Sequence, residues 1–376
     1  MIFFVRHNMP IMSCVCFIIA LILYYSMSVE LMKYPELFLQ GAILLDDVLV
    51  YILALQILKS SLNTRRIFTN LQYNQVDYSS DKTRLLALVS AFPFGLGVSS
   101  FLKGLSKSAI NTKPISEGVT ASMLIYPTTL ASGFVFDSFG LSSLSALFLF
   151  GLPVVITIFL ISLKKSLLSL VKTKLFLIVA VLGLCNYLYL LTLSQFIPQY
   201  FMLKQALFFI LISFLLNVKI ASNIPHVLWA TKNSFVFFIC VGILGHAFIN
   251  WLDSLNLTIS HSLLNIFVFV AIPVFIIPLF SILFIHPLVL FMIFNPVLSP
   301  HLLEAGFSSL SIYVVWIVML INAQLLSPVS LTTVLSVSNS STNIFSESFM
   351  KHSLYALKIS CLTYIYIFII YYFCEQ

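Results

Sequence analysis

Apolar runs about as long as a membrane is thick recur along this chain, and they limit what it can fold into. Examples are residues 141–163, 175–196 and 355–373. A helix of about 20 predominantly apolar residues crosses roughly 30 Å of hydrocarbon. Of the 376 residues, 60% are hydrophobic and 8% are charged, and the mean hydropathy is +1.08. The sequence therefore predicts an all-α polytopic membrane protein.

The basic residues gather in polar stretches between the apolar runs. Residues 59–84 and 164–174 each contain several lysines or arginines. Because short cytoplasmic loops carry an excess of these residues, we expect both stretches to be cytoplasmic. The formal net charge of +7 is spread thinly over such loops, so it indicates topology and not a nucleic-acid surface. We expect a multi-pass protein of the cell inner (cytoplasmic) membrane.

Two regions interrupt the apolar pattern in a similar way. In the first, residues 92–97 (FPFGLG) precede a Tyr-Pro pair at 126–127; in the second, an Asn-Pro pair at 295–296 precedes a Ser-Pro pair at 327–328. Irregular backbone is tolerated at membrane depth only where protein buries it or where it lines a watery cavity. We therefore expect each region to form a re-entrant hairpin followed by a broken helix, and such paired features indicate a transport site.

The two interrupted regions also predict an internal repeat. The prolines at 93 and 127 are separated by nearly the same number of positions as those at 296 and 328, and similar spacing in two halves is typical of duplication. We expect about 9–11 transmembrane helices in all. The count of spans gives a parallel repeat, whereas Lys351 and His352, which prefer the cytoplasmic side, favour an inverted one. Both arrangements remain open.

This order divides the chain into four segments. They are 1–84 (N-terminal helices and basic loop), 85–174 (first hairpin and broken helix), 175–262 (connecting helices) and 263–376 (second hairpin, broken helix and last helix).

Hydroxyl and amide side chains cluster at the predicted breaks. There, the amino ends of half-helices direct N–H groups at an anion, and freed carbonyls can surround a small cation. The candidate substrate- or ion-binding residues are Ser99, Ser100, Thr128, Thr129, Asn295, Ser327, Ser330, Thr332 and Thr333. Every arginine lies at or before Arg84, so a carboxylate ligand would be held without a guanidinium clamp. The alternative for each hydroxyl is a bond within its own helix or packing at a helix interface.

Several ionisable residues within apolar sequence have more than one interpretation. Asp46 and Asp47 are either an ion or proton site or the watery outer end of a tilted helix. Glu117 is expected to complement the positive end of its own helix. His246 and His286 are able to relay protons, but we expect them to be satisfied structural histidines.

The order of hairpin, broken helix, further spans, second hairpin and second broken helix resembles the ion transporter superfamily. This superfamily includes divalent anion/sodium symporters and the large membrane subunits of tripartite dicarboxylate carriers. In the symporters, a Ser-Asn-Thr motif at each hairpin tip binds sodium and the substrate carboxylate. The nearest string here is SNS at 338–340, which follows the second broken helix, and the first hairpin offers GVSS at 97–100. The resemblance implies cation-coupled transport of organic anions.

These features lead us to expect a secondary active transporter of a small organic anion, coupled to Na⁺ or H⁺ and without a bound cofactor, with its site near the midplane. No catalytic triad, metal motif or phosphate loop is recognisable, so we do not expect an enzyme. The expected partners are the lipid bilayer and the anion, with a second copy of the chain as a further candidate and no nucleic acid. Two alternatives remain open: a membrane enzyme acting on lipid-linked sugars, and a non-transporting assembly or signalling component.

Overall fold

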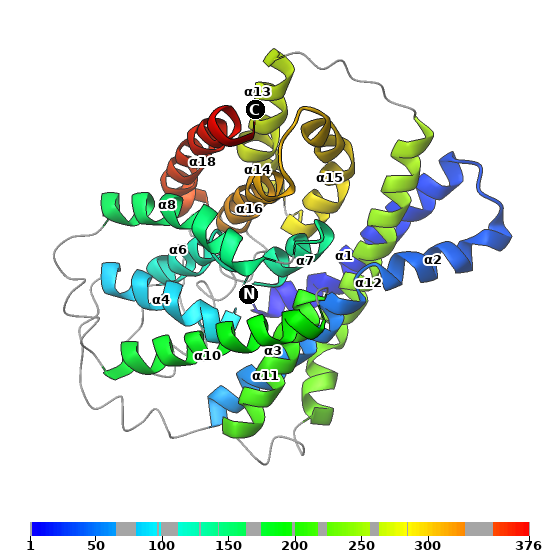
Figure 1. Cartoon of the computed structure of the whole chain (residues 1–376). Helices are drawn as coiled ribbons and strands as arrows, with labels where there is room; N and C mark the ends of the chain where they lie inside the picture. Colours follow the sequence, from blue (N-terminus) through cyan, green and yellow to red (C-terminus); the bar gives the residue numbers. More distant parts are fainter. Residues whose placement is uncertain are drawn as a thin grey trace.

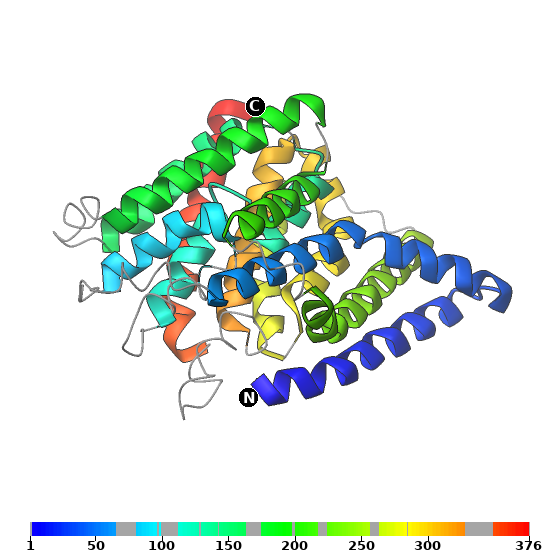
Figure 2. The same cartoon turned by 90° about the horizontal axis from the view of Figure 1, so that it is seen from below.

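All regular secondary structure in the described residues is helical, as Figures 1 and 2 show from two directions. The computed structural model describes residues 2–64, 80–95, 98, 112–127, 129–141, 143–162, 174–197, 200–216, 224–255, 263–283, 285–327 and 349–375. In chain order, the helices are α1 (Ile2–Ser26), η1 (Leu31–Lys33), α2 (Tyr34–Ile43), α3 (Asp46–Thr64), α4 (Ser80–Phe94), α6 (Thr112–Ser122), α7 (Leu130–Ser138), α8 (Leu144–Ser162), α10 (Lys174–Phe196), α11 (Phe201–Leu216), α12 (Ile224–Ser254), α13 (Leu263–Ala271), η5 (Ile272–Ile276), α14 (Ile277–Phe280), η6 (Ser281–Leu283), α15 (Pro287–Glu304), α16 (Ser309–Leu326), α18 (Lys351–Ile370) and η8 (Tyr371–Glu375).

Among the described residues, six helical segments are long and apolar enough to cross a membrane. They are Phe176–Phe196, Thr231–Trp251, Ile266–Leu283, Pro287–Glu304, Ser309–Leu326 and His352–Phe373. The pair α2 and α3 would add a seventh, and three further apolar helices are shorter than a full span. The prediction of an all-α, multi-pass membrane protein is therefore confirmed, whereas the count of about 9–11 spans stays a prediction.

Helix α16 lies at the centre of the bundle, and α10 lies at its edge. Within the apolar window of each span, 83% of the residues are buried in α16 and 22% in α10. Helices α14, α15 and α18 pack around α16, whereas α1, α2 and α12 pack together on one side of the molecule (Figure 1). Helices α6 and α7 also contact α16. The first interrupted region is thus packed against the most buried helix.

Helices α2 and α3 meet at an angle of 48°. Asp46 and Asp47 are the first residues of α3, where the amino end of a helix favours carboxylates. The backbone N–H of Asp47 donates to Oδ1 of Asp46 at 2.7 Å, and Asp46 is exposed. The two carboxylates therefore lie at a bend and begin a helix.

Helices α4 and α6 lie side by side and run in the same direction (Figures 1 and 2). Arg84, near the start of α4, contacts Glu117 of α6, and Phe92, near its end, stacks on Tyr126 with ring centroids 4.7 Å apart. Gly118 permits the close approach, because a Cβ there would overlap the carbonyl oxygen of Arg84. Both helices therefore begin on the same side of the molecule.

The described residues between α6 and α7, 123–127 and 129, are not helical. Helix α6 ends at Ser122, turns follow, and α7 begins at Leu130. Tyr126 and Pro127 lie in this interval, where the sequence predicts an interruption. Proline lacks a backbone N–H and disfavours the helical conformation of the residue before it, so a helix tends to stop there.

The predicted interruption at Asn295-Pro296 is wrong. Helix α15 continues through both of its interior prolines. A proline removes one helical hydrogen bond, but neighbouring helices and side chains can satisfy the groups that it frees in a membrane protein. The chain is non-helical directly before α15, at the start of the stretch 286–300 where the sequence predicts the turn of the second hairpin, and there Nδ1 of His286 accepts the N–H of Leu288 at 3.3 Å and caps the helix.

Candidate functional site

The structure describes only three of the predicted binding residues. Thr129 precedes α7, Asn295 lies within α15, and Ser327 directly follows α16. The other predicted residues lie outside the described part of the chain: Ser99, Ser100, Thr128, Ser330, Thr332 and Thr333.

Thr129 is the N-cap of α7. Its hydroxyl accepts the backbone N–H of Ser132 at 3.3 Å, and the hydroxyl of Ser132 accepts the backbone N–H of Thr129 at 3.0 Å. This reciprocal capping box satisfies two of the N–H groups that a helix start leaves open. The hydroxyl of Thr129 therefore has a structural function. Thr129 and Ser132 are both inaccessible to solvent.

Asn295 and Ser327 are also held by partners of their own. The hydroxyl of Ser299 donates to Oδ1 of Asn295 at 2.6 Å and accepts the indole N–H of Trp316 at 2.7 Å. This chain of hydrogen bonds ties α15 to α16. The backbone N–H of Ser327 donates to the carbonyl of Ala323 at 2.9 Å and ends α16.

A buried polar cluster that the sequence did not reveal lies beside the end of α4. Nδ2 of Asn186, in α10, donates to the carbonyl oxygen of Phe92 at 2.6 Å and to Oε1 of Gln205, in α11, at 3.3 Å. Both amide side chains have 0% exposure. Oδ1 of Asn186 and Nε2 of Gln205 have no hydrogen-bond partner in the described part of the chain.

Tyr126 completes this group, which we name the Phe92 cluster: Phe92, Tyr126, Asn186 and Gln205. The ring of Tyr126 stacks on Phe92 at the interruption between α6 and α7. Its hydroxyl is buried and, in the residues that the structure describes, has no hydrogen-bond partner. An unpartnered buried polar group costs about 1–3 kcal/mol. Each of the three unpartnered groups is therefore satisfied only if a polar ligand or water reaches it.

The sequence shows the two amides of this cluster individually, but it does not show that they are in contact. Asn186 and Gln205 are amides within apolar runs, and polar residues at membrane depth are often functional. One amide barely changes the length or the hydrophobicity of an apolar run, so the run alone does not single it out. Asn186 lies 94 positions from Phe92, and nothing in the sequence joins them.

A charged contact lies at the other end of α4 and α6. Nε of Arg84 donates to Oε2 of Glu117 at 2.8 Å, and both side chains are largely buried. Nζ of Lys113 and Nδ1 of His352 lie 3.9 and 3.8 Å from Oε1 of the same carboxylate. Glu117 is therefore the partner of a buried arginine, a role that its interpretation as a helix-end charge did not include, and Arg84 is part of α4 rather than of the basic loop.

A second charged contact lies beyond the interruption. Asp137, near the end of α7, accepts the backbone N–H groups of Phe201 and Met202 at 2.7 and 2.9 Å. It thus caps the amino end of α11, where a carboxylate is favoured. Lys204 of α11 donates to the carbonyl of Ile197 at 3.0 Å. Helices α6 and α7 are therefore each held by a carboxylate, one on each side of the interval between them.

The two histidines in question have structural partners. Nδ1 of His246 lies 2.8 Å from the hydroxyl of Tyr24, which joins α12 to α1. His286 caps α15, and its ring packs against those of Phe237 and Phe238. These contacts agree with the expectation of satisfied structural histidines.

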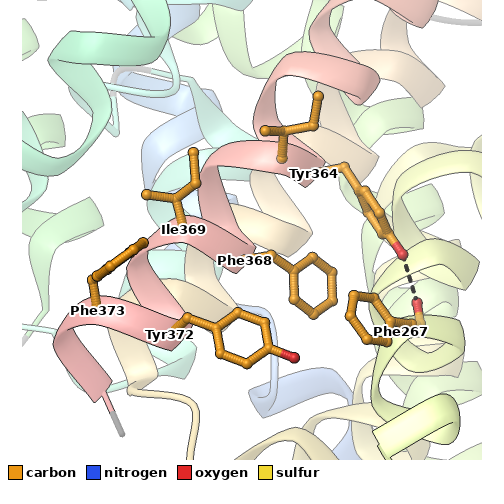
Figure 3. Close-up of a pocket in the computed structure, with 7 residues that line it drawn as sticks. Phe267, Tyr364, Phe368, Ile369, Tyr372 and Phe373 are labelled. Carbon is orange, nitrogen blue, oxygen red and sulfur yellow. Dashed lines mark hydrogen bonds between the residues drawn. The ribbon is translucent and has the colours of Figure 1, made fainter.

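Figure 3 shows an apolar groove between α13 and α18, lined mainly by aromatic and aliphatic side chains. The hydroxyl of Tyr364 donates to the carbonyl of Phe267 at 3.2 Å, which is the dashed line in the figure. Ile365, Ile369 and Phe373 are exposed along it. A hydrocarbon surface on a spanning helix suits contact with lipid and offers nothing to a charged solute.

In comparisons with known proteins, no family model and no curated protein matches this chain. The resemblance to the ion transporter superfamily therefore stays a prediction.

Proposed function

We propose that this protein is a secondary active transporter of a small organic anion, coupled to Na⁺ or H⁺ and located in the cell inner membrane. The observation that carries the proposal is the Phe92 cluster, with three unpartnered polar groups inside a bundle of apolar helices. Polar groups of this kind are costly at membrane depth, and they mark solute or ion pathways.

The interrupted backbone beside the cluster supports this function. Transporters bind their solutes near the midplane, where helices are broken and backbone groups are available. Phe92 lies in the last turn of α4, and Tyr126 lies between α6 and α7. We take α4 as one arm of a re-entrant hairpin, since α4 and α6 begin on the same side. In the second half, α16 ends at Leu326, directly before the Ser-Pro pair where the sequence predicts the second broken helix.

The two carboxylates of the broken helix suit a protein whose binding site opens alternately to each side. Glu117 fastens α6 to α4 through Arg84, and Asp137 fastens α7 to α11. Rigid-body movement of one helix group against another would break one contact while the other holds.

The test uses the purified full chain reconstituted into liposomes. A radiolabelled small organic anion should accumulate under an inward Na⁺ or proton gradient. Asn186→Leu should abolish accumulation, because it removes the amide that joins Phe92 to Gln205. Thr192→Val is the matched control on the same helix, since the hydroxyl of Thr192 is exposed and bonds to the carbonyl of Leu188.

Two results would count against the proposal. Liposomes that accumulate no organic anion under either gradient would contradict transport, and equal loss in both variants would contradict the site. Turnover of a lipid-linked sugar without accumulation would favour the membrane enzyme instead.

A further inference from the structure

Glu117 is the point at which three helices bring basic side chains together. Arg84 of α4 holds Oε2 of this carboxylate through two of its nitrogens. Oε1 faces Nζ of Lys113, on α6, at 3.9 Å and Nδ1 of His352, on α18, at 3.8 Å. The side chain of Glu117 is 1% exposed and that of His352 is 7% exposed. We name this group the Glu117 cluster: Arg84, Lys113, Glu117 and His352.

Helix α18 lies directly against α6 at this cluster. The hydroxyl of Tyr355, one turn after His352, donates to the backbone carbonyl of Glu117 at 3.2 Å. Positions three apart lie on one face of a helix, so His352 and Tyr355 are both directed at α6. A change of charge at His352 therefore acts on the contact between α18 and the first half of the broken helix.

The other elements packed against α18 bring no charge to this position. Helices α16 and α8 and η5 contain no charged residue. Glu375 of η8 lies at the opposite end of α18, and Lys358, on α18 itself, is exposed. The charged side chains that the structure places beside His352 are therefore those of the Glu117 cluster.

The chemistry of the cluster suits a proton better than a metal cation. Arg84 and Lys113 carry donors and no acceptor atom, so among the four side chains only the carboxylate offers oxygen to Na⁺. A proton binds to the imidazole itself. The protonated ring carries a proton on both nitrogens, so Nδ1 then faces Oε1 as a charged donor. A movement of about 1 Å turns the separation of 3.8 Å into a charge-assisted hydrogen bond.

The two permanent cations leave room for a third at Oε1. Arg84 is directed at the other oxygen, Oε2. The side chain of Lys113 is 41% exposed, so water screens its charge and reaches the edge of the cluster.

We propose that the Glu117 cluster is a proton-binding site, with His352 as the proton acceptor and Glu117 as its counter-ion. The proposal rests on the transport function proposed above and selects H⁺ over Na⁺ as the coupling ion. Uptake of one proton converts the neutral imidazole of His352 into an imidazolium, and the carboxylate of Glu117 stays ionised. The ion pair that results ties α18 to α6, and loss of the proton releases it.

The proton itself is the probe in the first test. The purified full chain, labelled with ¹⁵N-histidine, is titrated between pH 5 and pH 8 by NMR, and the signal missing from His352→Gln identifies His352. Its imidazole should pass from the protonated to the neutral form within this range. An imidazole that stays in one form throughout would overturn the proposal. This measurement needs no change at Glu117, so it decides the proposal even if a variant there does not fold.

Glu117→Gln and Glu304→Gln form a matched pair of variants. Nδ1 of His301 lies 3.7 Å from Oε2 of Glu304, so the two pairs have nearly the same separation, but Glu304 is 59% exposed. Glu117→Gln should move the midpoint of the His352 titration to lower pH by at least about one unit, because the imidazolium loses its counter-ion. Glu304→Gln should move that of His301 by clearly less, since water screens an exposed pair. Equal shifts would overturn the proposal.

The liposome experiment separates the coupling ion from transport itself. With radiolabelled lactate and succinate offered together, an inward proton gradient should drive accumulation, and His352→Gln should lose most of it while His301→Gln keeps it. Accumulation that a Na⁺ gradient alone drives, or that His352→Gln leaves unchanged, would overturn the coupling role while transport still holds. If neither anion accumulates under either gradient, transport and the coupling role fail together, and the NMR titration still decides whether His352 binds a proton beside Glu117.

Discussion

The two proline-containing interruptions predicted in this chain have different outcomes. Tyr126-Pro127 lies in the interval between α6, which ends at Ser122, and α7, which begins at Leu130, whereas Asn295-Pro296 lies inside one continuous helix. The difference lies in the residues after each proline. Thr129 provides a capping box for a new helix, while Ser299 bonds back to Asn295 within the same helix. In this comparison, the interrupted site is the one where the residues after the proline also provide a new helix start.

The largest expected effect contrasts an ion pair in each half. Arg84→Met leaves the carboxylate of Glu117 buried without its main partner, and we expect a loss of about 3–5 kcal/mol. Glu304→Gln removes the partner of His301 in the second half, but Glu304 is 59% exposed, so the loss should be slight. Thermal unfolding in detergent measures both. Equal effects would contradict the burial of the first pair.

The next effect contrasts two close helix contacts. A Cβ on Gly118 would meet the backbone carbonyl of Arg84, whereas one on Gly245 would meet the flexible end of Met292. Gly118→Ala should therefore cost about 1–3 kcal/mol, and Gly245→Ala clearly less, because only the methionine can move aside. The Tm of each variant is the measurement, and the reverse order would show that α4 can separate from α6.

A smaller effect tests the new helix start itself. Thr129→Ala removes the capping hydroxyl of α7 and should cost about 1 kcal/mol. Thr157→Ala is the control, since the hydroxyl of Thr157 bonds to the carbonyl of Pro153 within α8 and is exposed. Chemical or thermal unfolding compares the two. If Thr129→Ala is as mild as the control, the capping box does not define the break.

The smallest effect concerns the continuous helix. Pro296→Ala restores a backbone N–H to α15 and should leave stability unchanged or raise it by about 1 kcal/mol or less. Transport should also be unchanged, because α15 is not interrupted there. A loss of transport with intact stability would restore the idea of a functional break at Asn295-Pro296. Pro127→Ala is the counterpart in the first half.

Much of the fold could be predicted because each apolar helix is encoded locally. The predicted span 175–196 differs from α10 by one residue at its start, and the predicted span 355–373 lies within α18 and η8. Length and hydrophobicity alone decide such segments. Length and hydrophobicity do not predict whether a proline interrupts a helix, since the hydrogen bonds of the residues after it also matter, as at Thr129 and Ser299.

The candidate site was less predictable, because its contacts are distant in the sequence. Asn186 meets Phe92 across 94 positions, and Arg84 meets Glu117 across 33. In the sequence, hydroxyl-rich segments indicate a binding site more strongly than an isolated amide does. Thr129, the predicted residue nearest the break that the structure describes, uses its hydroxyl to start a helix.

The hydrogen bond from the hydroxyl of Tyr355 to the carbonyl of Glu117 also bears on the order of folding. It joins residues 238 positions apart, at 3.2 Å. Tyr24 and His246, separated by 222 positions, form a similar link. During synthesis, helices made early wait for partners made late. The surroundings of Glu117 are complete only after α18 has entered the membrane, so a nascent chain lacking that helix would hold its buried ion pair in an unfinished bundle.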